Sequence, residues 1–531
     1  MKCRAKYIKE VDIELVPVLD DPRTWSPTRK NVVLFIISAA AMIAGLAANI
    51  QNPAIQQMQE QLPATSSQIS LSLSLFILSQ GSAPLLWSAL SEIKGRKLVY
   101  ILSIGLSTVG CVVTALASNI GLVIGFRCLQ GVGSSSVVSL GAATLADLYP
   151  PSIRGTKMGI YYAAPLLGPS LGPILGGVLT AGFSWRACFW FMAIFSGASF
   201  LTFLLFLKDT WRKERSLTYQ NVLRTRLREL AGDEDKWVRG DGKKTSPSPD
   251  HASSVTEIAA TSAGKSGLAT DPMADDNHTT VAGPKSDSVP PDVPDIKLSF
   301  SDVNPIQPLW LVLRRPNNFI ILLASGSLYA FGFLISYTTA RTLGNMYHYN
   351  ALKIGLVLLS FGLGNLAGSV LGGRYSDYTY RKHKNECEGR ASPETRLRST
   401  FLGMVLLPPC ILGFGWVSQQ HLPIAAMCAF LFLNGFFSIW IYASTLAYIL
   451  DANNGRSSTA VAANSTFRGL FAFFATEIAV PLQDAVGDGW MYTIWGMIMV
   501  ATEFLIFIVI WKGGKWREQS EKREAESRFK L

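Results

Sequence analysis

The sequence predicts an all-α integral membrane protein with twelve transmembrane helices, from its composition and from the placement of its charges. Of the 531 residues, 49% are hydrophobic and only 16% are charged, whereas a soluble globular protein carries about 25% charged residues. Asp, Glu, Lys and Arg are absent between Glu60 and Glu92, and again between Arg398 and Asp451. Because about 20 apolar residues cross a bilayer, such gaps hold one or two spans each. A soluble enzyme, a disulfide-rich secreted domain and a disordered protein are thereby excluded.

Twelve apolar segments are long enough to cross a membrane. We expect helices, because a lipid-exposed backbone must satisfy its own hydrogen bonds and the sequence lacks the period-2 alternation of barrel strands. The first segment shows no signal-peptide cleavage pattern, so we expect it to be retained. The segments are 32–52, 67–90, 97–117, 121–147, 156–180, 186–207, 317–343, 353–374, 399–417, 422–450, 458–482 and 489–511.

Positive charge predicts the orientation. The tails 1–31 and 512–531 each carry seven Lys and Arg residues, and an even number of spans places both tails on one side. Since Lys and Arg mark the cytoplasmic side of membrane proteins, both termini are expected in the cytoplasm. The formal charge of +11 resides in these tails and in the loops on their side. It is therefore a topology signal, and nucleic acid is not an expected partner.

The longest polar segment divides the spans into two sets of six. Residues 208–316 include long stretches rich in Ser, Pro, Asp and Gly, a composition that buries too little apolar surface to fold alone. We therefore expect an N-terminal six-helix bundle at 32–207, a cytoplasmic and largely disordered linker at 208–316, and a C-terminal six-helix bundle at 317–511. Cytoplasmic tails at 1–31 and 512–531 flank them.

The two halves repeat a pattern of charges at matching places. An acid followed by basic residues comes after spans 2 and 8, and spans 4 and 10 each end in an acid with an arginine beyond it. Two parallel six-helix repeats with the substrate held between them are a known transporter plan. The repeated residues are Glu92, Lys94, Arg96, Lys97, Asp147 and Arg154 in the first half and Asp377, Arg381, Lys382, Asp451 and Arg456 in the second.

Several segments match transporter motifs. The loop SALSEIKGRK has Gly95, Arg96 and Lys97 in the pattern G-x-x-x-D-R-x-G-R-K, with Glu92 in place of Asp, and a second copy keeps its Gly and Asp after span 8. Span 4 contains RCLQGVG, which fits R-x-x-Q-G-x-G, and span 5 contains GPSLGPILGG, an expanded form of G-P-x-x-G-G. On these motifs the chain resembles the major facilitator superfamily, in particular its fungal twelve-span drug:proton antiporter branch. The resemblance covers everything except the tails and the linker.

The resemblance implies the major facilitator fold, with two pseudo-symmetric six-helix bundles, and a gating role for the charged cytoplasmic loops. Ion pairs there would latch the helices and break when the cavity opens inward. The alternative is that these charges only set the topology, since exposed pairs contribute about 0–1 kcal/mol each. The expected gating residues are Glu92, Gly95, Arg96, Lys97, Asp147, Arg154, Gly373, Asp377, Arg381, Lys382, Asp451 and Arg456.

Charged residues inside the spans are candidates for proton coupling, because an unpaired Arg near the bilayer centre costs at least about 2.5–3.5 kcal/mol. The resemblance implies that Arg127, with Gln130 in the same motif, supports proton transfer or an anionic group. The alternative is a structural tether to backbone carbonyls. Glu477 in span 11, with Arg468 nearby, is the best candidate for the acid that exchanges the proton. Glu503 in span 12 is expected to face another helix or the interface.

Span 5 combines glycines every four residues with prolines. Such a small-residue stripe lets a neighbouring helix approach closely, and the prolines remove backbone donors and permit kinks. The match to the antiporter motif implies a hinge and a seal between the halves, whereas ordinary helix packing is the alternative. The motif residues are Gly168, Pro169, Gly172, Pro173, Gly176 and Gly177.

In the family that the chain resembles, spans 1, 4, 7 and 10 line the substrate cavity. A mostly apolar pocket with few polar groups suits amphipathic organic molecules, although buried Tyr and Asn can also join helices to one another. Arg341, at the outer end of span 7, would either attract an anionic substrate or extend to the membrane surface. The cavity candidates are Asn49, Tyr161, Tyr337, Arg341, Asn365, Asn434, Tyr442 and Asn464.

These observations predict a secondary active transporter that exports a small organic compound, such as a drug, a secondary metabolite or an organic acid, in exchange for protons. The alternatives are an uptake carrier or uniporter of the same fold and a transporter-like sensor. An enzyme is not expected, because no HExxH, GxSxG or paired-His array lies in a span. No metal or cofactor is expected either, since seven Cys and five His are scattered without ligand spacing, and the proton gradient would supply the energy. The protein is expected to be monomeric and in the plasma membrane, with the vacuolar membrane as the alternative.

Overall fold

The computed structural model describes residues 18, 20–212, 216, 219–220, 222, 299, 306–386, 392–453 and 457–529. Within these residues the chain forms helices and no strand, which confirms the predicted all-α fold class. Most of the predicted linker 208–316 lies outside the described residues. All of the helices named below belong to one compact unit of the chain.

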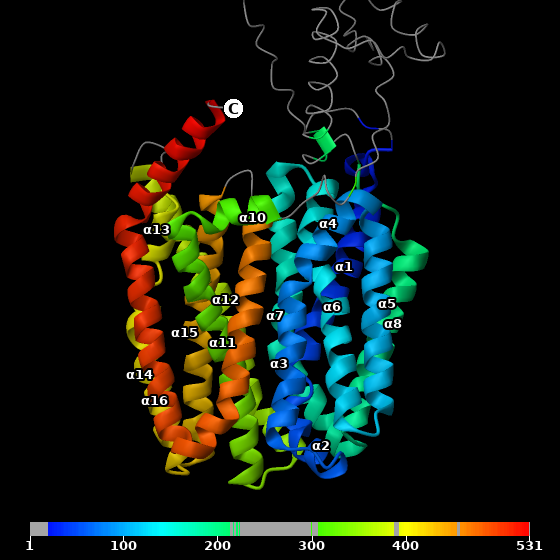
Figure 1. The fold of residues 1–531 in the computed structure, drawn as a ribbon, viewed down its shortest axis with the longest axis vertical. Coiled ribbons are helices and arrows are strands. Elements are labelled where there is room, and N and C mark those ends of the chain that lie inside the picture. The colour runs from blue at the N-terminus through cyan, green and yellow to red at the C-terminus, as the bar shows by residue number, and fades with distance from the viewer. Residues whose placement is uncertain are drawn as a thin grey trace, which may run out of the picture. The chain divides into compact units, whose positions relative to one another are not determined.

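Two sets of helices follow one another along the chain, here called the N-terminal half and the C-terminal half. Figure 1 shows their helices running alongside one another, with α2 at one end and α10 and α13 at the other. The first set comprises α1 (Pro27–Asn49), α2 (Ile55–Gln61), α3 (Ser66–Ser82), α4 (Pro84–Lys94), α5 (Arg96–Leu116), α6 (Ile120–Leu148), α7 (Pro151–Gly182) and α8 (Trp185–Phe206). The second comprises α10 (Ile306–Leu313), α11 (Pro316–Asn345), α12 (Ala351–Glu386), α13 (Glu394–Arg398), α14 (Phe401–Gln419), α15 (Ile424–Ala452) and α16 (Ser457–Phe529).

Eleven stretches of the described residues are long and apolar enough to cross a membrane. The last of them, Thr459–Glu524, holds two of the predicted spans, because Gly487 interrupts α16 with a φ of 75°. A positive φ is readily adopted by glycine, which has no Cβ. Predicted span 2 likewise consists of two helices, α3 and α4, with Pro84 at the start of the second. The predicted number of twelve spans fits this arrangement.

Polar residues before several helices cap the helix starts. The hydroxyl of Thr65 accepts a hydrogen bond from the backbone of Gln68, whose side chain accepts one from the backbone of Thr65. Asn119 accepts from the backbone of Leu122 at the start of α6. Such bonds satisfy donors that the first helical turn leaves free, so these short polar segments separate one apolar span from the next.

The two halves meet along two helix pairs, α3 with α16 and α7 with α12. In the first pair a Cβ on Gly81 would lie 2.6 Å from the Cα of Gly469. In the second pair a Cβ on Gly355 would lie 2.3 Å from the carbonyl oxygen of Pro173, and one on Gly362 would lie 2.3 Å from the Cα of Ser170. Backbone therefore touches backbone across the interface, which only glycine permits.

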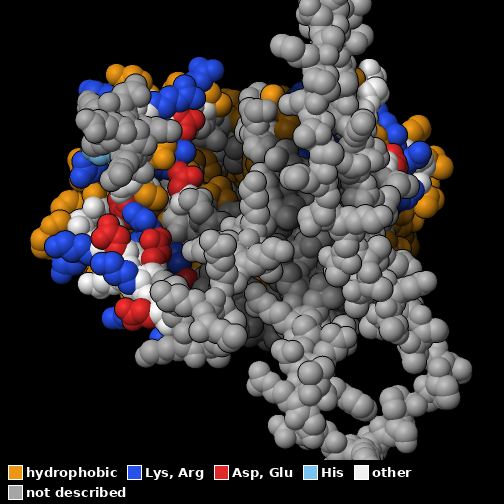
Figure 2. All heavy atoms as spheres, turned by 90° about the horizontal axis from the view of Figure 1, so that it is seen from above, with side chains coloured by type: hydrophobic (Ala, Val, Ile, Leu, Met, Phe, Trp, Pro, Cys, Tyr) orange, Lys and Arg blue, Asp and Glu red, His pale blue; other side chains and the backbone are white. Residues whose placement is uncertain are grey.

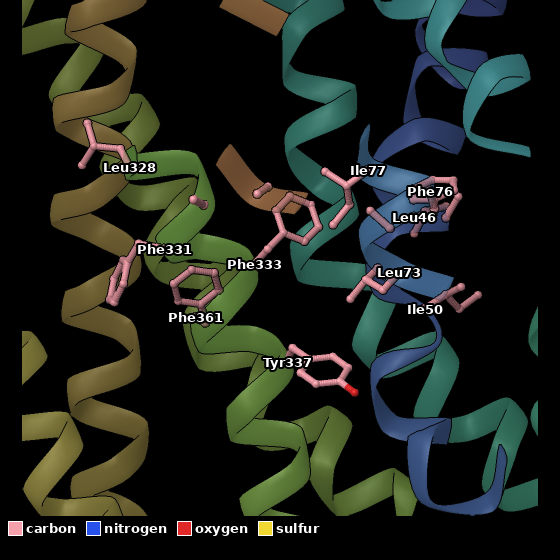
Figure 3. Packing of buried hydrophobic residues seen from close by; sticks show 14 of the residues in the cluster. Leu46, Ile50, Leu73, Phe76, Ile77, Leu328, Phe331, Phe333, Tyr337 and Phe361 are labelled. Atoms are coloured by element: carbon pink, nitrogen blue, oxygen red, sulfur yellow. The ribbon is translucent and has the colours of Figure 1, made fainter. Parts of the chain in front are cut away.

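Side chains extend the contact between the halves toward the end of the molecule that carries α2. Figure 3 shows Phe333 and Tyr337 of α11 pointing toward the helices of the N-terminal half, where Leu73 and Ile77 of α3 lie. The Tyr337 hydroxyl donates to the backbone carbonyl of Ser66 at 3.4 Å. Because Ser66 begins α3 directly after the segment that contains α2, this bond closes the α2 end of the interface.

The glycine stripe of α7 has a different neighbour from the one expected. Gly168 and Gly176 contact Gly45 and Ile50 of α1, which belongs to the same half, and a Cβ on Gly172 would lie 2.9 Å from the Cβ of Asn49. The expected seal between the halves comes instead from the adjacent face of α7, on which Gly177 and Pro173 lie. The four-residue spacing correctly indicated close helix packing, but spacing alone does not reveal the partner.

We expect Gly362→Ala to destabilise the protein, because the added methyl group would push α12 away from the backbone of α7. Overpacking of this kind costs about 1–3 kcal/mol. Gly373→Ala on the same helix is the matched control, since a Cβ there has no heavy atom within 4 Å and alanine favours the helix by about 1 kcal/mol. Thermal unfolding of the purified protein, followed by tryptophan fluorescence, measures both; equal unfolding temperatures for the two variants would contradict the close contact.

Candidate functional site

A buried arginine joins the first pair of repeated acids. Arg96 donates to Glu92 at 2.9 Å and to Asp147 at 3.5 Å, and its side chain also contacts the Ser91 hydroxyl. Only 6% of Arg96 is exposed, so a charge here requires these partners. The cluster ties the end of α4 to the start of α5 and the end of α6.

Gly95 is required by the backbone geometry of this cluster. Its φ is 86°, and a Cβ there would lie 2.0 Å from a carboxylate oxygen of Asp209. Asp209 also accepts a hydrogen bond from the backbone N–H of Arg96 at 3.1 Å. Asp209 follows α8 and was not singled out from the sequence, yet it completes the cluster. Lys97 has a different contact, since it donates to the carbonyl of Leu204 at 3.0 Å.

The second pair of repeated acids is joined in the same way, but by an arginine that the sequence analysis did not select. Arg396 of α13 donates to Asp377 at 2.9 Å and to Asp451, and it lies over the ring of Tyr380. Burial alone would lower the pKa of Arg396, but the hydrogen bonds and charges of the two carboxylates outweigh it and raise that pKa. Both acids of the repeat therefore meet one guanidinium, as in the first half.

Some of the predicted gating residues that the structure describes do not take part in these clusters. Arg381 and Lys382 are exposed on α12, and Arg396 takes the place expected for them beside Asp377. Arg456 and the side chain of Arg154 lie outside the described residues. The ion pairs of both clusters connect helices of the same half. In this conformation they therefore stabilise each half by itself and do not join one half to the other. Figure 2 shows charged side chains of both signs gathered on this face over the C-terminal half.

Arg127 occupies a closed position inside the N-terminal half. It donates to the carbonyl of Ala47 and to the side chain of Gln130, both at 2.9 Å, and its guanidinium lies 4.1 Å from the centre of the Phe76 ring. Its exposed fraction is 0%, and among the described residues it has no carboxylate partner. Gln130 in turn contacts the Cys111 sulfur. This environment fits the tether to a backbone carbonyl that was the alternative interpretation.

Arg468 lies among tyrosines of the C-terminal half. It donates to the hydroxyl of Tyr442 at 2.9 Å, and its guanidinium lies 3.8 Å from the ring centre of Tyr329. The Asn464 side chain reaches the same Tyr442 hydroxyl at 3.5 Å. These residues come from α11, α15 and α16, and three sequence candidates are thus brought together: Arg468, Tyr442 and Asn464.

Glu477 lies at the contact between the two halves. Its carboxylate accepts a hydrogen bond from the Ser74 hydroxyl of α3, and the neighbouring Ser70 donates to the carbonyl of Thr476 at 2.6 Å. The expected proximity to Arg468 does not produce a pair, because the two residues stand nine positions apart on α16 and have different partners. Glu503 is 7% exposed and is directed into the packed helices, where one carboxylate oxygen has no hydrogen-bond partner among the described residues.

Several cavity candidates have partners inside their own half. Tyr161 donates to the carbonyl of Val137, and Asn434 donates to the carbonyls of Cys410 and Phe430. Asn49 donates to Gly45 and packs on Gly172 of α7. These three residues join helices in the described conformation. By contrast, Tyr337 reaches the other half, as shown above, while Asn365 on α12 is 8% exposed.

Arg341 is paired near the C-terminal end of α11. It forms an ion pair with Asp484 at 2.7 Å and donates to Gln483 at 2.9 Å. Next to it, Asp488 accepts hydrogen bonds from Gln483 and from the hydroxyls of Thr342 and Ser418. This polar cluster links α11, α14 and α16 beside Gly487. It was missed in the sequence because its acids, which lie in α16 on either side of Gly487, belong to no repeated motif.

Arg396→Gln should lower the stability of the C-terminal half by about 1–2 kcal/mol, since it leaves Asp377 and Asp451 without their shared cation. Arg381→Gln is the matched control, because Arg381 is exposed on the neighbouring helix. The unfolding temperatures of the two purified variants measure the difference. If Arg381→Gln destabilised as much as Arg396→Gln, the assignment of the cluster to Arg396 would be wrong.

Comparison with known proteins supports a transporter. A family model described as Major Facilitator Superfamily matches residues 37–476. The chain is 27% identical to the MFS antiporter QDR3 of Candida albicans, with 95% of this chain and 81% of the relative covered. It is 25% identical to Citrate exporter 1 of Aspergillus niger, with 94% and 89% covered.

A solved structure shows the same fold. The D-xylose-proton symporter superposes with a TM-score of 0.59 at 13% identity, covering 91% of this chain and 97% of that one. Together with the two helical halves and the family match over most of the spans, this similarity settles the class: the chain belongs to the Major Facilitator Superfamily and is a multi-pass membrane transporter, not an enzyme.

Proposed function

We propose that this transporter exports a small organic compound in exchange for protons, by alternating access of its two halves. The observation that carries the proposal is the Glu477 carboxylate, which accepts the Ser74 hydroxyl across the interface. A titratable group placed between the two moving parts links protonation to their separation. Its contacts are with a neutral hydroxyl and, nearby, Tyr337, and no described cation forms an ion pair with it.

Protonation of Glu477 is expected to weaken its hydrogen bond to Ser74. An ionised carboxylate accepts a hydrogen bond about twice as strongly as a neutral acceptor does. Deprotonated Glu477 therefore holds α16 against α3, and protonation weakens that contact. Because the bond between Ser70 and Thr476 is adjacent, loosening one contact relaxes the other, and the halves can rearrange.

The relatives support the direction of transport. One is named an antiporter and another an exporter, and the span-5 motif of this chain matches the antiporter pattern. Uptake and signalling remain the alternatives, and the experiment below separates them. Transport is expected to need no cofactor, and the chain is expected to act as a monomer.

We further propose that both termini lie in the cytoplasm and that the protein works in the plasma membrane. The support is the concentration of Lys and Arg in the tails and in the loops on their side. In the described structure, α10, α13 and the end of α16 lie at one end of the molecule and α2 lies at the other (Figure 1).

The orientation predicts which sites antibodies reach. An epitope placed after Leu531 should be detected only in permeabilised cells, whereas one inserted after Tyr347, between α11 and α12, should be detected in intact cells. Surface staining of cells that express each tagged chain measures both. Detection of the C-terminal epitope in intact cells would overturn the proposed orientation.

Glu477→Gln should abolish proton coupling, since glutamine keeps the size and the hydrogen bond but cannot release a proton. First, the metabolites exported by cells with and without the protein identify a substrate. Its transport into vesicles that contain the purified protein is then measured with and without an imposed pH gradient. We expect the gradient to stimulate the wild type at least about tenfold more than the variant.

Glu60→Gln is the control for this experiment, because Glu60 is an exposed acid on α2. It should respond to the gradient like the wild type. Transport by the wild type that ignored a collapsed gradient would exclude antiport and favour a uniporter. Absence of any transported compound, with signalling lost on deletion of 240–295, would favour the sensor.

A further inference from the structure

Arg468 differs from most other arginines that the described helices bury or half-bury. Arg96, Arg341 and Arg396 each form an ion pair with a carboxylate at 2.9 Å or less. The described contacts of the Arg468 guanidinium are with Tyr442 and Tyr329, and its Nε is buried without a hydrogen-bond partner. Among the described residues no acid neutralises it.

An unpaired guanidinium at the middle of a span is costly unless an anion or water reaches it. Arg127 is the other such residue, but its side chain is fully buried between Ala47, Gln130 and two phenylalanine rings and is not accessible from outside. Arg468 is only partly buried. A ligand can therefore supply the missing negative charge at Arg468.

The position of Arg468 is suited to a transported ligand. The next residue, Gly469, contacts Gly81 of α3 in the N-terminal half. Tyr442, whose hydroxyl accepts a hydrogen bond from the guanidinium, belongs to α15, which packs against α12 of the second helix pair. A molecule bound at Arg468 would thus lie beside both helix pairs at which the halves meet.

The neighbouring groups specify the kind of anion. A guanidinium presents its N–H donors in a plane that matches the two oxygens of a carboxylate. The ring centres of Tyr329 and Tyr442 lie 3.8 Å and 5.3 Å from the guanidinium, and the Phe333 ring lies 5.0 Å from that of Tyr329. Aromatic rings prefer edge-to-face or offset contacts with another ring, so these rings can pack against an aromatic ligand. One oxygen of Asn464 is also buried without a partner and can accept a hydroxyl of the ligand.

We propose that Arg468, Tyr329, Tyr442 and Asn464 form a binding site for an aromatic carboxylic acid in its ionised form. The carboxylate would bind the guanidinium, and the ring would lie against the tyrosines. This inference rests on the proposed transport function for its physiological meaning. Binding itself requires neither a proton gradient nor a direction of transport. A result that refutes the binding site therefore leaves proton-coupled export untouched, and the reverse also holds.

The test uses 2-naphthoate and its neutral analogue 2-naphthamide with the purified full-length chain. The rise in unfolding temperature with ligand concentration gives a dissociation constant for each. We expect 2-naphthoate to bind the wild type at least about tenfold more tightly than the amide, because only the acid supplies a charge-assisted bond. Arg468→Gln should remove this preference, and Arg468→Lys should retain part of it, since lysine keeps the charge but not the planar donors.

Arg374→Gln is the matched control, because Arg374 is an exposed arginine on α12; it should leave both constants unchanged. The proposed site is supported if Arg468→Gln loses the preference for 2-naphthoate over 2-naphthamide while Arg468→Lys and the control variant keep it. Equal binding of acid and amide by the wild type overturns the proposal, as does an unchanged preference in Arg468→Gln. If Arg468→Gln does not fold, the comparison of acid with amide on the wild type and on Arg468→Lys still decides it.

Discussion

An ionised side chain inside a bilayer must have a partner, and this constraint explains where most charges of the chain lie. Arg96 and Arg396 each hold two carboxylates at a helix end, and Arg341 is paired with Asp484 at the opposite end. In these places the helices are fixed to one another at their ends, where water also reaches the ions. Between the ends the packing is mostly apolar, or it uses hydroxyl and amide groups that a helix can satisfy itself; the charged exceptions described above are Arg127, Arg468, Glu477 and Glu503. The rigidity of each half follows from this arrangement.

The contact between the halves has the opposite character. It consists of backbone against backbone at Gly81, Gly355 and Gly362, with a few hydrogen bonds from serine hydroxyls. Without hydrophobic driving force in lipid, such helix contacts depend on close packing and on weak polar bonds. Opening this interface breaks few polar contacts, and the one carboxylate described there, that of Glu477, can be neutralised by a proton. The halves are therefore stiff bodies joined by a contact that can be remade, which is what alternating access requires.

The sequence predicted the spans and the repeated acids well, because lipid imposes a length and a composition that are visible in the chain. It did not predict the partners. Arg396 replaced Arg381 beside Asp377, since α13 packs the polar segment after α12 back onto the helix ends. Tyr161 and Asn434, which were predicted for the cavity, form hydrogen bonds within their own halves, and their contact with a substrate stays a prediction. Which face of a helix meets which neighbour depends on packing over the whole bundle, and a polar residue in a span gives no sign of it.

The two halves share a plan, but the arginine that each holds in mid-span has a different environment in each half. Each contains one arginine in mid-span without a described acid, Arg127 in the first and Arg468 in the second. Arg127 is enclosed and tied to the carbonyl of Ala47, so its charge is a permanent feature of the N-terminal half. Arg468 is partly accessible and lies nine positions before Glu477, the residue that meets Ser74. An anion on Arg468 and a proton on Glu477 would each change the contacts of α16. If the two ligands favour different positions of this helix, they compete with one another, and such competition is a physical basis for exchanging one for the other.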